Sequence, residues 1–146
     1  MDKKSFLQAG HTPTLLAAFL YFDLSFMVWV ILGPLGIGIA KDLGLSHAEK
    51  GLMVATPVLA GALLRVVMGV LVDRLSPKKA AIIGQVIVIA ALLYAWLAGV
   101  HSYAEVLVLG GFLGVAGASF AAALPLASRW YPAEHQGTAM GIAGAG

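Results

Sequence analysis

The 146-residue sequence contains no cysteine and very little charge. The lack of cysteine excludes a disulfide framework, a thiolate metal site and a cysteine nucleophile. Only 11% of the residues are charged, whereas a soluble domain carries about a quarter. With 60% apolar residues the chain could not cover its own surface in water, so we expect it to lie in a lipid bilayer.

Basic clusters and catalytic motifs are also missing. The nine lysines and arginines are scattered and are not interleaved with aromatic residues, so nucleic acid is not an expected partner. There is no G-x-S-x-G motif, no phosphate-binding loop and no glycine fingerprint after a strand. No two of the four histidines have the i,i+3 or i,i+4 spacing of a metal site. We therefore expect no enzyme, no cofactor and no metal centre.

Long apolar stretches dominate what is present. Four of them exceed the roughly 20 helical residues that cross a bilayer, at residues 13–39, 51–73, 78–100 and 103–127. A fifth, 137–146, is expected to be a truncated span. An open sheet would leave backbone groups unpaired in lipid, so these stretches predict an all-α membrane protein. Residues 1–12 are expected to form a cytoplasmic N-terminus, and residues 13–146 the helical part.

Polar residues mark where three of these helices should begin. Ser46 with Glu49, and Ser102 with Glu105, have the S-x-x-E spacing of a capping box. Ser76 precedes a proline, which is typical of an N-cap followed by the first helical position.

The basic residues also predict an orientation. Cytoplasmic loops carry an excess of lysine and arginine. Six basic residues fall on one side of the predicted spans and two, Lys41 and Lys50, on the other; the six are Lys3, Lys4, Arg74, Lys78, Lys79 and Arg129. We therefore expect a multi-pass protein of the inner (plasma) membrane with its N-terminus in the cytoplasm.

Arg65 is the most informative single residue. It lies about 12 Å from the cytoplasmic end of the second span, too deep to reach the interface comfortably. A central arginine costs about 2.5–3.5 kcal/mol on insertion scales, so a partner is expected. Gly61 and Gly69 share its helix face and would let a helix or a ligand come close. A planar guanidinium fork suits a flat oxyanion, and the alternative is an ion pair with Asp23 in the first span.

The loop after the second span resembles a family motif. Residues 69–79 read GVLVDRLSPKK, similar to the G-x-L-a-D-r-x-G-r-k loop of the major facilitator superfamily. Gly69, Asp73, Arg74 and Lys78 match it, whereas Ser76 and Pro77 depart from it. The resemblance implies a major-facilitator-type helical bundle, in which residues 13–146 would be part of the N-terminal six-helix half of a transporter. They would hold the first four transmembrane helices and the start of the fifth. It also implies that the four matching residues form a conformational-gating loop.

Three further stretches resemble the nitrate/nitrite porter branch of that superfamily. They are FDLSFMVW at 22–29, FAAALPLASRWYP at 120–132, and GTAMGIAGAG at 137–146, which matches the start of a glycine-rich A-G-x-G-N signature. The resemblance implies alternating-access transport of nitrate or nitrite, completed by helices beyond this chain. Arg65 would grip the anion and Phe120 would flank it, with Phe112 as the alternative, while Gly141, Gly144 and Gly146 would let the fifth helix approach.

Two rival functions remain open. Another small anion, such as a carboxylate, would suit the same arginine. A non-transporting membrane sensor or assembly protein could be built on the same helices. Asp23 is a possible proton-coupling carboxylate in the transporter interpretation, and a locally hydrogen-bonded interface group in the simpler one.

Overall fold

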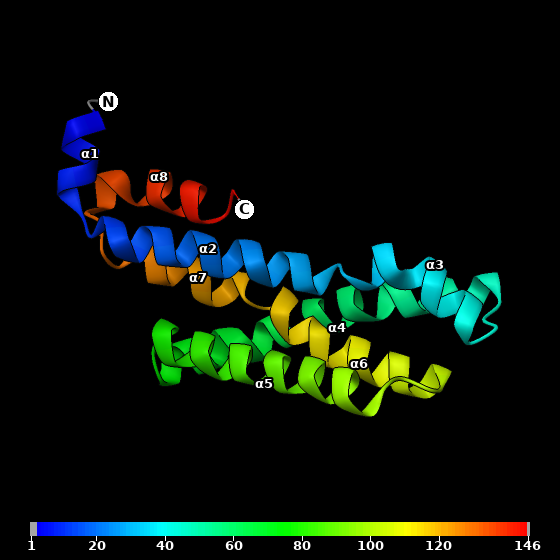
Figure 1. Cartoon of the computed structure of the whole chain (residues 1–146). Helices are drawn as coiled ribbons and strands as arrows, with labels where there is room; N and C mark the ends of the chain where they lie inside the picture. Colours follow the sequence, from blue (N-terminus) through cyan, green and yellow to red (C-terminus); the bar gives the residue numbers. More distant parts are fainter. Residues whose placement is uncertain (1–2, 146) are drawn as a thin grey trace.

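Eight α-helices make up the computed structural model, which describes residues 3–145 and the side chains from Phe6 onward (Figure 1). No strand occurs within that range. The helices are α1 (Lys3–Ala9), α2 (Thr12–Trp29), α3 (Leu32–Asp42), α4 (His47–Arg74), α5 (Pro77–Ala98), α6 (Tyr103–Gly117), α7 (Phe120–Ser128) and α8 (Ala133–Ala143).

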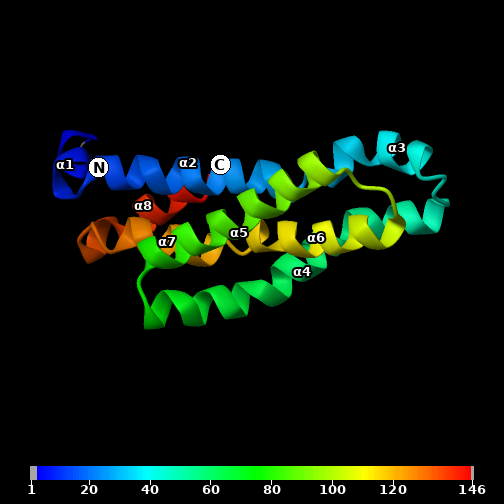
Figure 2. The same ribbon diagram turned by 60° about the horizontal axis from the view of Figure 1, so that its bottom comes forward.

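Four apolar helical segments of this described part are long enough to cross a membrane. They are Thr12–Asp42, His47–Arg74, Pro77–Ala98 and Tyr103–Ser128. The segments run up and down along one long axis, so the α4–α5 and α7–α8 turns lie at one end and the α3–α4 and α5–α6 turns at the other (Figures 1 and 2). The expected all-α, multi-spanning architecture is confirmed.

The first and fourth segments are each interrupted, which the sequence did not predict. The first breaks between α2 and α3: Pro34 has no amide hydrogen for the Val30 carbonyl, which accepts from Gly33 at 2.9 Å instead. The fourth breaks between α6 and α7, at Ala118 and Ser119. Both halves of each segment are apolar, so hydropathy alone shows one continuous run.

Two of the three predicted helix starts have the expected hydrogen bonds. The Ser46 hydroxyl accepts from the Glu49 amide at 3.3 Å, and the Ser46 amide donates to the Glu49 carboxylate at 2.8 Å. Ser76 caps α5 by accepting from the Lys79 amide at 3.3 Å, with Pro77 as the first helical residue.

The third start differs in detail. Ser102 accepts from the Glu105 amide at 3.3 Å, but the Glu105 carboxylate accepts from the His101 amide at 2.7 Å. The reciprocal half of the capping box is therefore displaced by one residue, and it fixes the turn before the helix.

Helix α1 packs against the α7–α8 turn at the end of the bundle that carries the α4–α5 turn. Residues 1–12 include α1, where the Phe6 ring stacks on Tyr131 with centroids 4.9 Å apart. The fifth apolar stretch begins as a helix at Ala133, four residues before the expected start at Gly137. α8 then runs beside α2 and α7 (Figure 1).

Helices α4 and α6 pack with their backbones in close approach. A Cβ atom added to Gly114 would lie 2.5 Å from the Ala60 Cβ and 2.8 Å from the Gly61 amide nitrogen. Small residues therefore bring the two backbones into contact, as is typical of helix pairs in membranes. This contact brings Arg65, one turn after Gly61, beside the break between α6 and α7.

Candidate anion-binding site

Arg65 reaches across from α4 to the break in the fourth segment. Its Nη2 donates to the Gly117 carbonyl at 3.2 Å, and its Cζ lies 5.6 Å from the centroid of the Phe120 ring. The side chain is otherwise exposed in this chain. One hydrogen bond uses a single N–H of the five that a guanidinium carries, so most of the fork is open to a ligand.

The helix break explains why the Gly117 carbonyl is available. In a continuous α-helix the Ala121 amide would donate to Gly117, four residues earlier. Here that amide donates to Ala118 at 3.1 Å. The tighter turn releases the Gly117 carbonyl, and the Arg65 guanidinium occupies it with a charge-assisted hydrogen bond.

No carboxylate neutralises Arg65 in the part of the chain that the structure describes. Asp23 is half-buried on α2 and forms neither a hydrogen bond nor an ion pair with any residue between 3 and 145. The alternative of a permanent Arg65–Asp23 pair is therefore not what the structure shows. The local hydrogen bond considered for Asp23 is not formed either.

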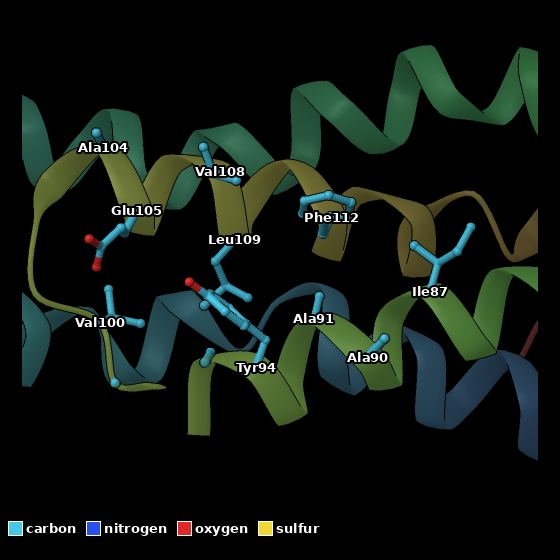
Figure 3. Close-up of a pocket in the computed structure, with 12 residues that line it drawn as sticks. Ile87, Ala90, Ala91, Tyr94, Val100, Ala104, Glu105, Val108, Leu109 and Phe112 are labelled. Carbon is cyan, nitrogen blue, oxygen red and sulfur yellow. The ribbon is translucent and has the colours of Figure 1, made fainter. Parts of the chain in front are cut away.

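Of the two candidate aromatic residues, Phe120 lies beside Arg65. The Phe22 ring on α2 meets Phe120 edge-on, with centroids 5.3 Å apart, and so supports it from behind. Phe112 lines a separate apolar groove of about 590 Å³ between α5 and α6, together with Tyr94 and Leu109 (Figure 3). The geometry favours Phe120.

The signature glycines differ in their surroundings. A Cβ on Gly144 would lie 3.4 Å from Cε2 of Phe120, so α8 touches the site there. A Cβ added to Gly141 or to Gly69 would meet no atom within 4 Å, and Gly146 lies outside the described residues. The structure therefore brings Gly144 to the site, but not Gly141.

The loop-motif residues lie together at one end of the bundle. Asp73 and Arg74 end α4, Lys78 lies in the first turn of α5, and only Leu75 and Ser76 separate the two helices. All three charged side chains are exposed, and none forms an ion pair within residues 3–145. Their charges are thus available to partners outside the described helices.

Three residues around the site were not predicted from the sequence. They are Gly117, Trp29 and Phe22. Phe22, Phe26 and Trp29 have the spacing of one helix face, which could have indicated a row of rings on α2. A backbone carbonyl such as that of Gly117 has no side-chain signal, because its release depends on the break.

Fold and site together define a multi-spanning helical membrane protein with an exposed arginine in the apolar part of its second span. A sequence profile of the Major Facilitator Superfamily matches residues 14–146. The chain belongs to this superfamily.

Individual relatives within the superfamily are named as nitrate or nitrite transporters. The probable nitrate/nitrite transporter NarK2 of Mycobacterium tuberculosis is 38% identical over 141 residues, which is 94% of this chain and 35% of that protein. The probable nitrate/nitrite antiporter NarK1 of Thermus thermophilus is 34% identical over 128 residues, or 87% of this chain and 28% of that protein. The nitrite extrusion protein of Bacillus subtilis is 33% identical over 121 residues, or 83% and 30%. These similarities confirm the resemblance to the nitrate/nitrite porter branch, and the chain spans about a third of these relatives' length.

Proposed function

We propose that this chain supplies one half of the anion site of a nitrate/nitrite transporter. The observation that carries the proposal is the Arg65 guanidinium, which is anchored to the Gly117 carbonyl, lies over the Phe120 ring and has no carboxylate partner among the described residues. The relatives' names support nitrate or nitrite as the ligand. The remaining helices of the full-length transporter would complete the site.

The chemistry of the site suits a small planar oxyanion. The fork of an arginine can donate two parallel hydrogen bonds to two oxygens in one plane. The Phe120 ring would pack against the flat face of the anion. It would also exclude water that would otherwise screen the attraction between the anion and the guanidinium. Transport would follow by rocking of the two halves around this site.

Other parts of the chain have proposed roles in the same cycle. Gly144 lets the end of α8 lie against Phe120, and Gly146, as a further signature glycine, would let the same helix approach the site. Gly141 has open space beside it, where a helix outside the chain could approach closely. Gly69, Asp73, Arg74 and Lys78 would gate the cycle by pairing with charges on the other half. Asp23 is the one carboxylate within the first apolar run and forms no ion pair within residues 3–145, so it is the candidate coupling group. The N-terminus would lie in the cytoplasm, because the larger set of basic residues faces that side.

Replacement of Arg65 by lysine tests the proposal. Lysine keeps the positive charge but loses the planar fork, so we expect Arg65→Lys in the full-length transporter to lower nitrate uptake at least about tenfold. Arg129→Lys, at the exposed end of α7, is the matched control and should transport normally. Uptake of labelled nitrate by these variants is measured at equal membrane abundance. Asp23→Asn is a further variant, and its uptake is measured at several pH values.

The rival functions give different results in the same assay. Normal nitrate uptake by Arg65→Lys would overturn the role of Arg65. Strong competition by a carboxylate, with none by nitrate or nitrite, would favour a different anion. The absence of any flux in the unmodified protein would favour a sensor or assembly protein.

A further inference from the structure

We propose that Trp29 positions the Arg65 guanidinium and thereby sets the preference of the site for a planar anion. The inference rests on the proposed anion site at Arg65. Trp29 ends α2, directly before the break in the first segment, and its indole is half-buried. The indole contacts α4, α6 and another aromatic residue of α2, and each contact leads to a group that holds Arg65.

On α4 the indole is held by a hydrogen bond. Its Nε1 donates to the Pro57 carbonyl at 2.7 Å. Pro57, Gly61 and Arg65 are spaced four residues apart, so they lie close to one face of α4. A Cβ added to Gly61 would lie 2.9 Å from the indole nitrogen. The ring therefore lies along the helix face that carries Arg65, one turn before it.

On α6 the same ring contacts the residue that anchors Arg65. A Cβ added to Gly117 would overlap the indole, so only a glycine fits there. Gly117 is the residue whose carbonyl accepts from Arg65. The indole thus packs against both Gly61 of α4 and Gly117 of α6, beside the hydrogen bond from Arg65 to the Gly117 carbonyl.

A row of rings connects Trp29 to the other contact of Arg65. The Trp29 and Phe26 centroids are 5.8 Å apart and those of Phe26 and Phe22 are 6.1 Å apart. Phe22 then meets Phe120, the ring beneath the guanidinium. Both the carbonyl and the ring that hold Arg65 therefore pack, directly or through two rings, against Trp29.

The consequence for transport is a specific loss of fit. The ring in Trp29→Phe fills less space and lacks the N–H, so the hydrogen bond to the Pro57 carbonyl is lost and Gly117 can shift. Arg65 would keep its charge, but the orientation of its guanidinium plane would be less fixed. A flat anion, which needs the fork in its own plane, loses more binding than a pyramidal anion of equal charge.

Trp29→Phe in the full-length transporter tests this inference against nitrate and pyramidal chlorate. We expect about a fivefold rise in the apparent KM for nitrate, a smaller rise for chlorate, and a maximal rate within about twofold of the unmodified protein. Trp96→Phe is the matched control, because Trp96 is 79% exposed on α5 and should change neither value. Trp29→Tyr, which retains a polar donor, should give a KM for nitrate between those of Trp29→Phe and the unmodified protein.

Several outcomes would overturn the inference. An unchanged ratio of the KM values for nitrate and chlorate in Trp29→Phe would do so, whether both values stay the same or both rise by the same factor. If Trp29→Phe is abundant but inactive, nitrate binding to the purified protein decides: a raised Kd supports the inference and an unchanged Kd opposes it. If Arg65→Lys transports normally, the anion site fails, whereas loss in Arg65→Lys with normal Trp29→Phe refutes the Trp29 role alone.

Discussion

Arg65 lies in the apolar part of its helix without a carboxylate partner among the described residues. Its contacts offset most of the free-energy cost of placing a charge there. The insertion cost is about 2.5–3.5 kcal/mol. A hydrogen bond from a charged group, as to Gly117, offsets about 1.5–3 kcal/mol. The Phe120 ring adds about 0.5–1 kcal/mol or more as the site is desolvated. The helices can therefore hold the guanidinium in place while its other donors stay free for an anion.

Phe120 should affect anion binding, whereas Phe112 should not. Phe120→Leu removes the ring face under Arg65 and the edge contact with Phe22, so we expect the apparent KM for nitrate to rise about two- to fivefold. Phe112→Leu is the matched control: Phe112 is 48% exposed and lines the α5–α6 groove (Figure 3). Concentration-dependent uptake by the two variants is compared, and a larger effect of Phe112→Leu would reverse the assignment.

At this scale the sequence predicts side chains better than backbone. Arg65 stands out because a charge in an apolar run is rare, and Phe120 follows from the family resemblance. The Gly117 carbonyl was missed because its availability is decided by a missing hydrogen bond from Ala121, which no residue type announces. Trp29 was missed because its role depends on Gly61 and Gly117, which approach it only in the folded bundle.

The helices themselves are readable from the sequence, but their interruptions are not. Apolar length predicted all four membrane segments, and serine caps predicted where three of them start. The breaks after Trp29 and Gly117 lie within uniformly apolar runs, so no change of composition marks them. Pro34 could have indicated the first break, because it removes a helical hydrogen bond, whereas no proline lies at the second, at Ala118 and Ser119. Both breaks lie beside residues of the proposed site.

The α4–α6 crossing should be sensitive to a single methyl group. Gly114→Ala places a Cβ within 2.8 Å of the Gly61 amide nitrogen, so the two helices must separate. We expect a loss of about 1–3 kcal/mol of stability, seen as a lower unfolding temperature of the purified chain in detergent. Gly111→Ala, on the same helix with nothing within 4 Å, is the control and should be neutral or slightly stabilising. Equal unfolding temperatures for the two variants would contradict the close contact.

The described helices form a bundle of apolar segments with extensive apolar surface and with more basic residues at one end than at the other. Large apolar side chains remain exposed on every span, as suits contact with lipid or with further helices; examples are Leu24, Leu63, Ile89 and Val108. Arg74, Lys78, Lys79 and Arg129 lie on helix ends and turns at one end of the bundle. Lys41 and Lys50 flank the α3–α4 turn at the other. The alternation of turns thus separates the basic residues as the orientation rule requires.

The absence of cysteine makes this orientation directly testable. Lys79→Cys and Lys41→Cys each introduce one thiol at an exposed position, at opposite ends of the bundle. If the N-terminus is cytoplasmic, a maleimide that cannot cross the membrane holding the protein should label Lys41→Cys on intact cells but not Lys79→Cys. Permeabilised cells should give labelling of both, which controls for reactivity. Labelling of Lys79→Cys alone on intact cells would invert the topology, and would place the proposed gating loop on the outer face.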